Sequence, residues 1–233
     1  MKKFFLSVAV LFAAAFTLRA QTADEIIAKY VTAIGGAEKW TKIQSIKLEG
    51  QIEVQGLAIP FIMQGVQMKG MRFDAEFQGN KIIEIVTPVK GWSQNPLAGK
   101  ATLSPMSEDE LKSKVDDLDL QDAFVDYKAK GSSVEFLGKD EEDGNEYLKI
   151  KMTTKNNNEK TYFFDTKTYL IYKVESIVKQ QGQEIKSSVK YLDYQTLDFG
   201  IKMSFKQDQG QMMLVTKKVS VNPVVEELIF NGN

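Results

Sequence analysis

The chain of 233 residues contains neither Cys nor His, and its 30 basic and 31 acidic side chains leave a net charge of −1. Without those two residue types the protein cannot form Ser-His-Asp or Cys-His nucleophiles, the usual His or Cys zinc sites, or disulfides. The balanced charge argues against nucleic acid as a partner, because nucleic-acid-binding proteins need a basic face.

Residues 1–20 have the pattern of a secretory signal peptide. Two lysines precede an apolar run (residues 4–16), and Ala20 offers a small residue for cleavage. The alternative is an uncleaved membrane anchor, but the run is short for a bilayer span. Cleavage leaves residues 21–233 as a single domain with 27 basic and 31 acidic side chains. The sequence therefore predicts an exported protein.

The mature chain begins with the pattern of a one-sided helix. Thr22 and Glu25 have the spacing of a capping box, and apolar residues at helical spacing follow as far as Ile34. Gly35-Gly36 ends the helix, and Trp40 is expected on the same side. Such a stripe needs an apolar partner, and the concave side of a sheet is the candidate.

Most of the remaining chain alternates strand patterns with turns of Gly, Asn and Asp. Short turns of this kind join antiparallel neighbours, so the pattern predicts an up-and-down meander. The predicted strands are residues 44–54, 57–69, 71–77, 81–87, 89–93, 133–138, 146–153, 160–165, 169–179, 184–194, 201–206 and 212–221.

One strand pattern, residues 57–69, has apolar side chains on both faces. Leu57, Ile59, Phe61 and Met63 share one parity, and Ile62, Val66 and Met68 have the other. The change predicts a β-bulge near Gly65, and it suggests that one face lines a cavity rather than a core.

The two strand-rich halves are separated by the only predicted helical insertion. Residues 95–106 are interpreted as a loop, and a second capping box at Ser107 and Glu110 predicts a helix over residues 108–117. A turn or short helix is expected at residues 120–129.

Two motifs were weighed as sites of chemistry. Ser187 and Lys190 have the Ser-x-x-Lys spacing of some acyl enzymes, but a strand places them on opposite faces. The acidic run at residues 140–143 could bind calcium, but it lacks the spacing of a calcium loop, which favours a solvated hairpin tip. The sequence therefore predicts no enzyme, no metal and no cofactor.

Short motifs along nearly the whole mature chain resemble the LolA/LolB-like outer-membrane lipoprotein-sorting proteins, a family of lipoprotein carriers. The motifs are Ala33-Ile34-Gly35-Gly36 ahead of Trp40, Arg72-Phe73, Gly91-Trp92, Phe163-Phe164-Asp165, Tyr169-Leu170-Ile171 and Tyr191-Leu192-Asp193-Tyr194. The resemblance implies a mainly β fold, in which a single curved antiparallel sheet of about eleven strands forms an incomplete, half-open barrel with a helical lid.

The resemblance also implies a function. Carriers of this family hold the acyl chains of lipoproteins in an apolar hollow in the periplasm of Gram-negative bacteria, and an Arg in an early strand holds the lid. Arg72 is the only Arg after residue 20, although Phe73 replaces the Pro that usually follows. The candidate ligand-binding residues are Leu57, Ile59, Phe61, Met63, Arg72 and Trp92.

The function that we expect is that of a periplasmic carrier or binding protein for lipids or the acyl chains of lipoproteins. The alternative is a non-carrier interaction domain of the same fold, which would contact another protein during envelope assembly. An open apolar hollow favours the carrier, whereas a hollow filled with side chains favours the interaction domain.

Cell fractionation tests the expected export. A processed protein that lacks about 20 residues should appear in the periplasmic or secreted fraction. An unprocessed form that requires detergent for extraction would show instead that residues 4–16 are an anchor.

Overall fold

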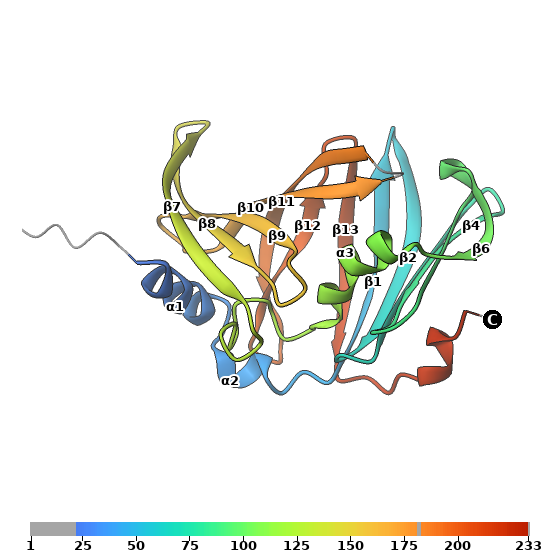
Figure 1. The fold of residues 1–233 in the computed structure, drawn as a ribbon, viewed down its shortest axis with the longest axis horizontal. Coiled ribbons are helices and arrows are strands. Elements are labelled where there is room, and N and C mark those ends of the chain that lie inside the picture. The colour runs from blue at the N-terminus through green and yellow to red at the C-terminus, as the bar shows by residue number, and fades with distance from the viewer. Residues whose placement is uncertain (1–21, 181–182, 233) are drawn as a thin grey trace, which may run out of the picture.

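A computed structural model describes residues 22–180 and 183–232, so the predicted signal peptide lies outside the described residues. The protein forms one antiparallel sheet of thirteen strands that is not closed into a barrel (Figure 1). The predicted mainly β, half-open architecture is confirmed, with thirteen strands rather than about eleven. No helix within the described ranges is long and apolar enough to cross a membrane.

The strands follow one another as a meander in each half of the chain. Their order across the sheet is β6-β5-β4-β3-β2-β1-β13-β12-β11-β10-β9-β8-β7. The bounds are β1 Ser45–Val54, β2 Leu57–Val66, β3 Gly70–Phe77, β4 Asn80–Val86, β5 Gly91–Asn95, β6 Lys100–Pro105, β7 Ser133–Glu142, β8 Asn145–Thr153, β9 Glu159–Asp165, β10 Ile171–Gln180, β11 Gln183–Thr196, β12 Lys202–Asp208 and β13 Met212–Val221.

The edge strand β6 lies where a loop was expected. It pairs only with β5, at Trp92↔Pro105, Ser93↔Ser104 and Asn95↔Lys100. A Pro is tolerated at the end of an edge strand because no neighbour needs its missing N–H. The turn residues that suggested a loop belong to the short 3-10 helix η1 (Pro96–Ala98) and its left-handed cap Gly99.

The two edges of the sheet, β6 and β7, are consecutive strands in the sequence. The first and last strands, β1 and β13, pair with each other and join the halves in the middle. The connection from β6 to β7 carries α3 (Glu108–Lys114) and the 3-10 helix η2 (Val115–Leu118). The opening of the half-barrel is therefore spanned by a helical connection and not by a ladder of strands (Figure 1).

The bulge predicted near Gly65 is wrong. The β1–β2 register runs without a shift from Ser45↔Val66 to Val54↔Leu57. A Cβ on Gly65 would lie 3.2 Å from the Leu120 side chain, so Leu120 fills the space where strand parity calls for an apolar side chain. The pattern changed because a residue from the helical connection covers this position.

The N-terminal helix α1 (Ala23–Ala33) covers the face of the sheet that we call the inner face. Its capping box is present as predicted, and Ile26, Ile27 and Tyr30 are buried. They belong to one core cluster with inward-facing residues of β8 and β9, and the rings of Tyr30 and Phe164 meet edge to face at 5.3 Å. The predicted packing of the stripe on the concave side is confirmed.

The C-terminal end of α1 approaches the turn before β12 closely. Ile34 accepts a 2.8 Å hydrogen bond from the Lys202 backbone N–H. Gly35 has φ +108°, and a Cβ there would lie 3.0 Å from the Ile201 Cα and closer still to the Gly200 carbonyl oxygen. Only glycine combines this backbone conformation with so close an approach.

An ionic cluster lies on the outer face. Glu142, at the end of β7, accepts hydrogen bonds from Lys173 and from Lys190, both at 2.7 Å. The Glu142 side chain is 29% exposed and paired with two lysines, so it differs from the solvated acid expected in this run. Ser187 pairs with Ser176 on the opposite face of β11, so Ser187 and Lys190 point apart, as predicted.

Comparing Gly35→Ala with Gly36→Ala separates the stability cost of a strained φ from the cost of a clash with the Gly200 backbone. Both glycines have positive φ, but nothing lies within 4 Å of a Cβ on Gly36. We expect each variant to lose about 1–3 kcal/mol through strain, and Gly35→Ala to lose more because the Gly200 backbone must move. Denaturant unfolding measures both, and equal losses would contradict the contact.

The Glu142 cluster predicts an acid-sensitive stabilisation. The hydrogen bonds from Lys173 and Lys190 lower the pKa of Glu142 from 4.5 to about 2. The stabilisation is therefore complete above the unfolded pKa and is lost as the pH falls from 4.5 to 2. Glu142→Gln should lower Tm at pH 7 but not at pH 2. Glu141→Gln is the control, since Glu141 is exposed, and a Tm difference that persists at pH 2 would contradict the cluster.

Candidate ligand-binding face

The inner face of the first half carries a second, separate cluster of apolar side chains. Four of them, Ile52, Ile59, Phe61 and Ala75, are buried. The side chains packed around them are partly exposed: Leu48, Val54, Met63, Phe73, Phe77, Ile82 and Leu214. We call these eleven residues the apolar face.

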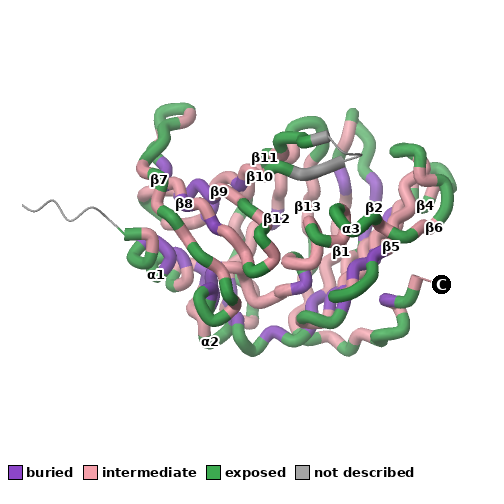
Figure 2. The backbone as a smooth tube through the Cα atoms, viewed as in Figure 1, coloured by how far each residue is buried: buried purple, intermediate pink, exposed green. Residues whose placement is uncertain are grey.

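The apolar face differs from the first core in what covers it. The cluster beneath α1 includes helix residues, whereas every described member of the apolar face comes from β1–β4 or β13. Figure 2 shows intermediate and buried residues along these strands, at the part of the sheet away from α1. Because no helix residue packs into this cluster, seven of its side chains stay partly exposed, and such a surface can accept an apolar partner.

Phe61 forms the floor of the apolar face. Its ring stacks on Phe73 with centroids 5.3 Å apart and an interplanar angle of 24°. It also lies over Gly50, where a Cβ would be 2.9 Å from the ring. The β1–β13 ladder shifts register between Glu49 and Gly50, so a bulge and a glycine together make room for this ring.

Three of the six candidate ligand-binding residues, Ile59, Phe61 and Met63, belong to the apolar face. Ile59 and Phe61 are each 4% exposed, and Met63 is half-buried beside them. Leu57 shares their strand and parity but is 44% exposed next to the β1–β2 turn. The structure places Ile59, Phe61 and Met63 in one cluster and leaves Leu57 outside it, and the contact of any of them with a ligand stays a prediction.

Arg72 and Trp92 lie on the opposite, outer face. Phe73 and Ala75 pair with Met63 and Phe61 and face inward, so Arg72, directly before Phe73 in the strand, faces outward. Its guanidinium forms two-pronged hydrogen bonds with Asp74, and its Nη1 donates to the Ile229 carbonyl at 3.1 Å. In the sequence, Arg72 and Asp74 alternate with the apolar residues Phe73 and Ala75. This alternation was the signal that could have placed Arg72 on the outer face.

The C-terminal segment covers both of these side chains. The 3-10 helix η3 (Glu227–Phe230) places Phe230 against Gly70, and the backbone at Gly232 packs on the Trp92 ring. Arg72 therefore holds the C-terminal segment on the outer face, and it makes no contact with the apolar face within the described chain. The lid-holding role implied by the resemblance gains no support from this placement.

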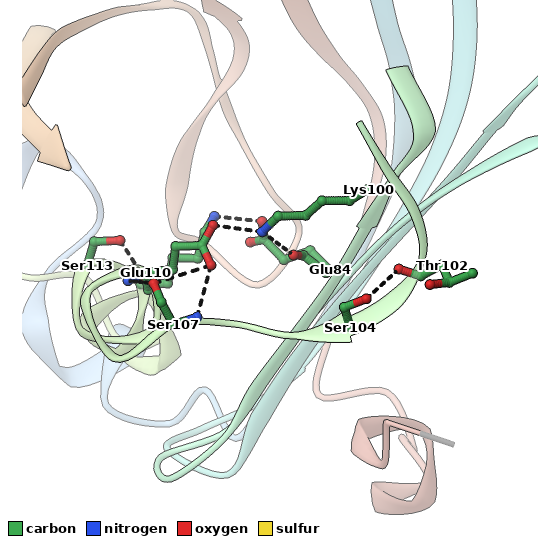
Figure 3. Close-up of polar contacts among 9 residues, drawn as sticks. Glu84, Lys100, Thr102, Ser104, Ser107, Glu110 and Ser113 are labelled. Carbon is green, nitrogen blue, oxygen red and sulfur yellow. Dashed lines mark hydrogen bonds and ion pairs between the residues drawn. The ribbon is translucent and has the colours of Figure 1, made fainter. Parts of the chain in front are cut away.

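Ion pairs attach α3 to the first half of the sheet (Figure 3). Lys100 donates to Glu110 at 2.7 Å and to Ser93 at 3.0 Å, and Lys114 pairs with Glu84 at 2.6 Å. The hydrogen bond from Lys100 lowers the pKa of Glu110, so the pair is ionised at neutral pH. None of the seven residues of α3 is buried.

Hydrogen bonds attach the other end of the same connection to the second half. Asp116 accepts from Thr154, Asn156 and Asn158 at 2.6–2.7 Å, so it fixes η2 to the β8–β9 turn. Asn158 also donates to the Lys112 carbonyl of α3 at 2.7 Å, so α3 is attached to both halves of the sheet, although its ion pairs, being at the surface, contribute little each. The sequence predicted α3 but not these partners, which are distant in the chain.

Comparison with known proteins shows similarity in fold and none in sequence. No family model matches the chain, and no curated protein matches it. A domain from Vibrio parahaemolyticus provisionally called an outer membrane lipoprotein-sorting protein aligns with a TM-score of 0.52 and 14% identity, over 89% of this chain and 95% of that one. A LolA superfamily protein from Nitrosomonas europaea aligns with a TM-score of 0.56 and 10% identity, over 91% and 98%.

A third structure, a DUF1329 family protein from Desulfovibrio piger, aligns with a TM-score of 0.54 and 12% identity, over 88% of this chain and 97% of that one. The chain has the LolA-like fold. The three alignments compare the path of the backbone. They confirm the predicted resemblance to the lipoprotein-sorting proteins as a resemblance in fold.

Arg72→Leu tests the contact that the structure shows. We expect faster hydrogen exchange in residues 227–232 and a loss of about 1–3 kcal/mol, because Asp74 and the Ile229 carbonyl lose a charged donor. Arg72→Lys keeps the charge but not the fork, so it should restore stability only in part. If Arg72→Leu leaves hydrogen exchange in residues 227–232 unchanged and alters it in α3, a lid-holding role for Arg72 would be favoured instead.

Proposed function

We propose that the protein is a periplasmic carrier or binding protein whose apolar face receives acyl chains of lipids or lipoproteins. The observation that carries the proposal is the apolar face itself, built from strand residues alone and half-exposed around a buried floor. Each methylene buried there gains about 0.8 kcal/mol, so part of an acyl chain suffices for measurable binding.

The attachment of α3 supports the proposal. A lid must open without unfolding the domain, and α3 is held by partly exposed ion pairs and a hydrogen bond from Asn158 rather than by buried side chains. Met63, with its flexible thioether, can adapt to apolar partners of different shape. The LolA-like fold, shared with proteins named for lipoprotein sorting, is consistent with this use of the face.

We further propose that the protein acts by binding alone, without catalysis or a cofactor. The Ser-x-x-Lys pair supports this, because Ser187 and Lys190 lie on opposite faces of β11 and cannot act together. If the purified protein binds no lipid, the remaining hypothesis is an interaction domain in envelope assembly. It would use the same fold with its hollow filled by side chains.

Met63→Asp tests the apolar face. Met63 is half-buried, so the chain should stay folded, while an unpaired carboxylate on an apolar surface should expel hydrocarbon. We expect lipid extractable by organic solvent from the wild-type protein and at least tenfold weaker binding of a fluorescent fatty acid by the variant. Gln64→Asp, on the outer face of the same strand, is the control and should bind normally.

Phe61→Asp should give a different result. Because Phe61 is 4% exposed and stacked on Phe73, the substitution should unfold the domain, with a loss of about 3–5 kcal/mol or more. Circular dichroism and a melting curve measure this. A folded Phe61→Asp protein with weaker lipid binding would show that Phe61 lines the ligand site directly, and a wild-type protein that binds no lipid would contradict the carrier proposal.

A further inference from the structure

A pocket of about 200 Å³ lies on the inner face beside α1, against strands β10–β12. Its lining is rich in hydrogen-bonding groups, although it adjoins the core beneath α1. The residues that matter here are Tyr30, Asp122, Tyr162, Tyr191, Tyr194 and Gln207. We call it the tyrosine pocket. At about 30 Å³ for each water, it has room for several waters or one small polar group.

Two of the four tyrosine hydroxyls have protein partners. Tyr30 donates to Asp122 at 2.6 Å, and Tyr194 donates to the Ile171 carbonyl at 2.8 Å. The hydroxyls of Tyr162 and Tyr191 make no hydrogen bond with any residue in the described ranges. Tyr162 is only 8% exposed, so its ring is packed while its hydroxyl is left for a partner from the pocket.

Those two hydroxyls are open to solvent in the pocket. Within the described residues no fully buried side-chain oxygen lacks a partner, so the oxygens of Tyr162 and Tyr191 must keep some accessible surface. A purely apolar ligand would displace their water and leave two donors unsatisfied, at a cost for each. A ligand with hydroxyl or carbonyl groups replaces that water without the cost.

The charge around the pocket favours an uncharged ligand group. Burial raises the pKa of Tyr162 and of Tyr191, so both stay neutral and can donate or accept. Lys160, on the same face of β9 as Tyr162, is already paired with Asp117 at 3.2 Å. Asp122 would repel an anion, although Lys202 also lines the pocket, so an anionic probe belongs in the test.

A row of cross-strand neighbours joins the tyrosine pocket to the apolar face. Tyr191 on β11 pairs with Gln207, which pairs with Leu214, which pairs with Ile52 on β1. Directly paired residues share a face of the sheet. With strands about 4.8 Å apart, Ile52 lies about 14 Å from Tyr191 along this row. The polar pocket and the apolar face are thus two parts of one surface.

We propose that the ligand is an amphiphile whose uncharged head, bearing hydroxyl or ester groups, hydrogen-bonds to Tyr162 and Tyr191 while its acyl chain runs along this row onto the apolar face. The inference rests on the proposed acyl-binding function and adds the class of head group and the orientation of the ligand. Gln207, between the two parts, is placed to contact the link between head and chain.

The test compares Tyr162→Phe and Tyr191→Phe with the wild-type protein. Monododecanoylglycerol supplies the uncharged head, dodecanoate an anionic head, and pyrene an apolar probe without one. Each variant should bind monododecanoylglycerol about threefold to tenfold more weakly, because one hydrogen bond to the head group is lost. Each should bind pyrene as well as the wild-type protein does, because no apolar contact is lost. Tm should not fall, since neither hydroxyl has a protein partner to lose.

Tyr147→Phe is the matched control, because Tyr147 is also buried but stacks on Tyr172 at the outer face. It should bind all probes normally. Three outcomes would overturn the head-group inference and leave the acyl-binding function in place. They are unchanged affinity of both pocket variants for monododecanoylglycerol, an equal loss of affinity for pyrene, and tighter binding of dodecanoate than of monododecanoylglycerol by the wild-type protein. A wild-type protein that binds neither pyrene nor monododecanoylglycerol would overturn the acyl-binding function as well.

Discussion

The pairing of β1 with β13 is the constraint on which the rest of the structure depends. It joins the first and last strands of the chain into one sheet and leaves β6 and β7 as edges. Because these edges are consecutive in sequence, the segment between them must cross the open side. The register shift in the same ladder, between Glu49 and Gly50, also makes the space for Phe61.

The two halves of the inner face are covered differently, and the candidate site follows from that difference. In the second half, α1 contributes Ile26 and Tyr30 to a packed core, and the tyrosine pocket is left open beside the helix. In the first half, α3 contributes no buried residue and is attached through ions. No helix residue belongs to the apolar face, so seven of its side chains stay partly exposed, and a surface of this kind can accept an apolar partner.

The outer face carries the contacts that keep the sheet in shape. Glu142 binds Lys173 and Lys190 near one edge, and Arg72 binds Asp74 and the C-terminal segment near the other. Charged groups on this face can pair without entering the hollow. The inner face combines apolar side chains and neutral tyrosines with charged groups that are paired, such as Lys160 with Asp117 and Glu84 with Lys114.

The sequence by itself determined the local structure: both capping boxes, the hairpin turns and strand β13 to the residue, because these depend on neighbours a few positions apart. It also placed Leu57, Ile59, Phe61 and Met63 on one face through strand parity. Only the tertiary structure decided which parts of the chain cover the inner and the outer face of the sheet. The edge strand β6, Leu120 over Gly65 and the C-terminal segment over Arg72 and Trp92 all arise from contacts between distant residues, which no local pattern encodes.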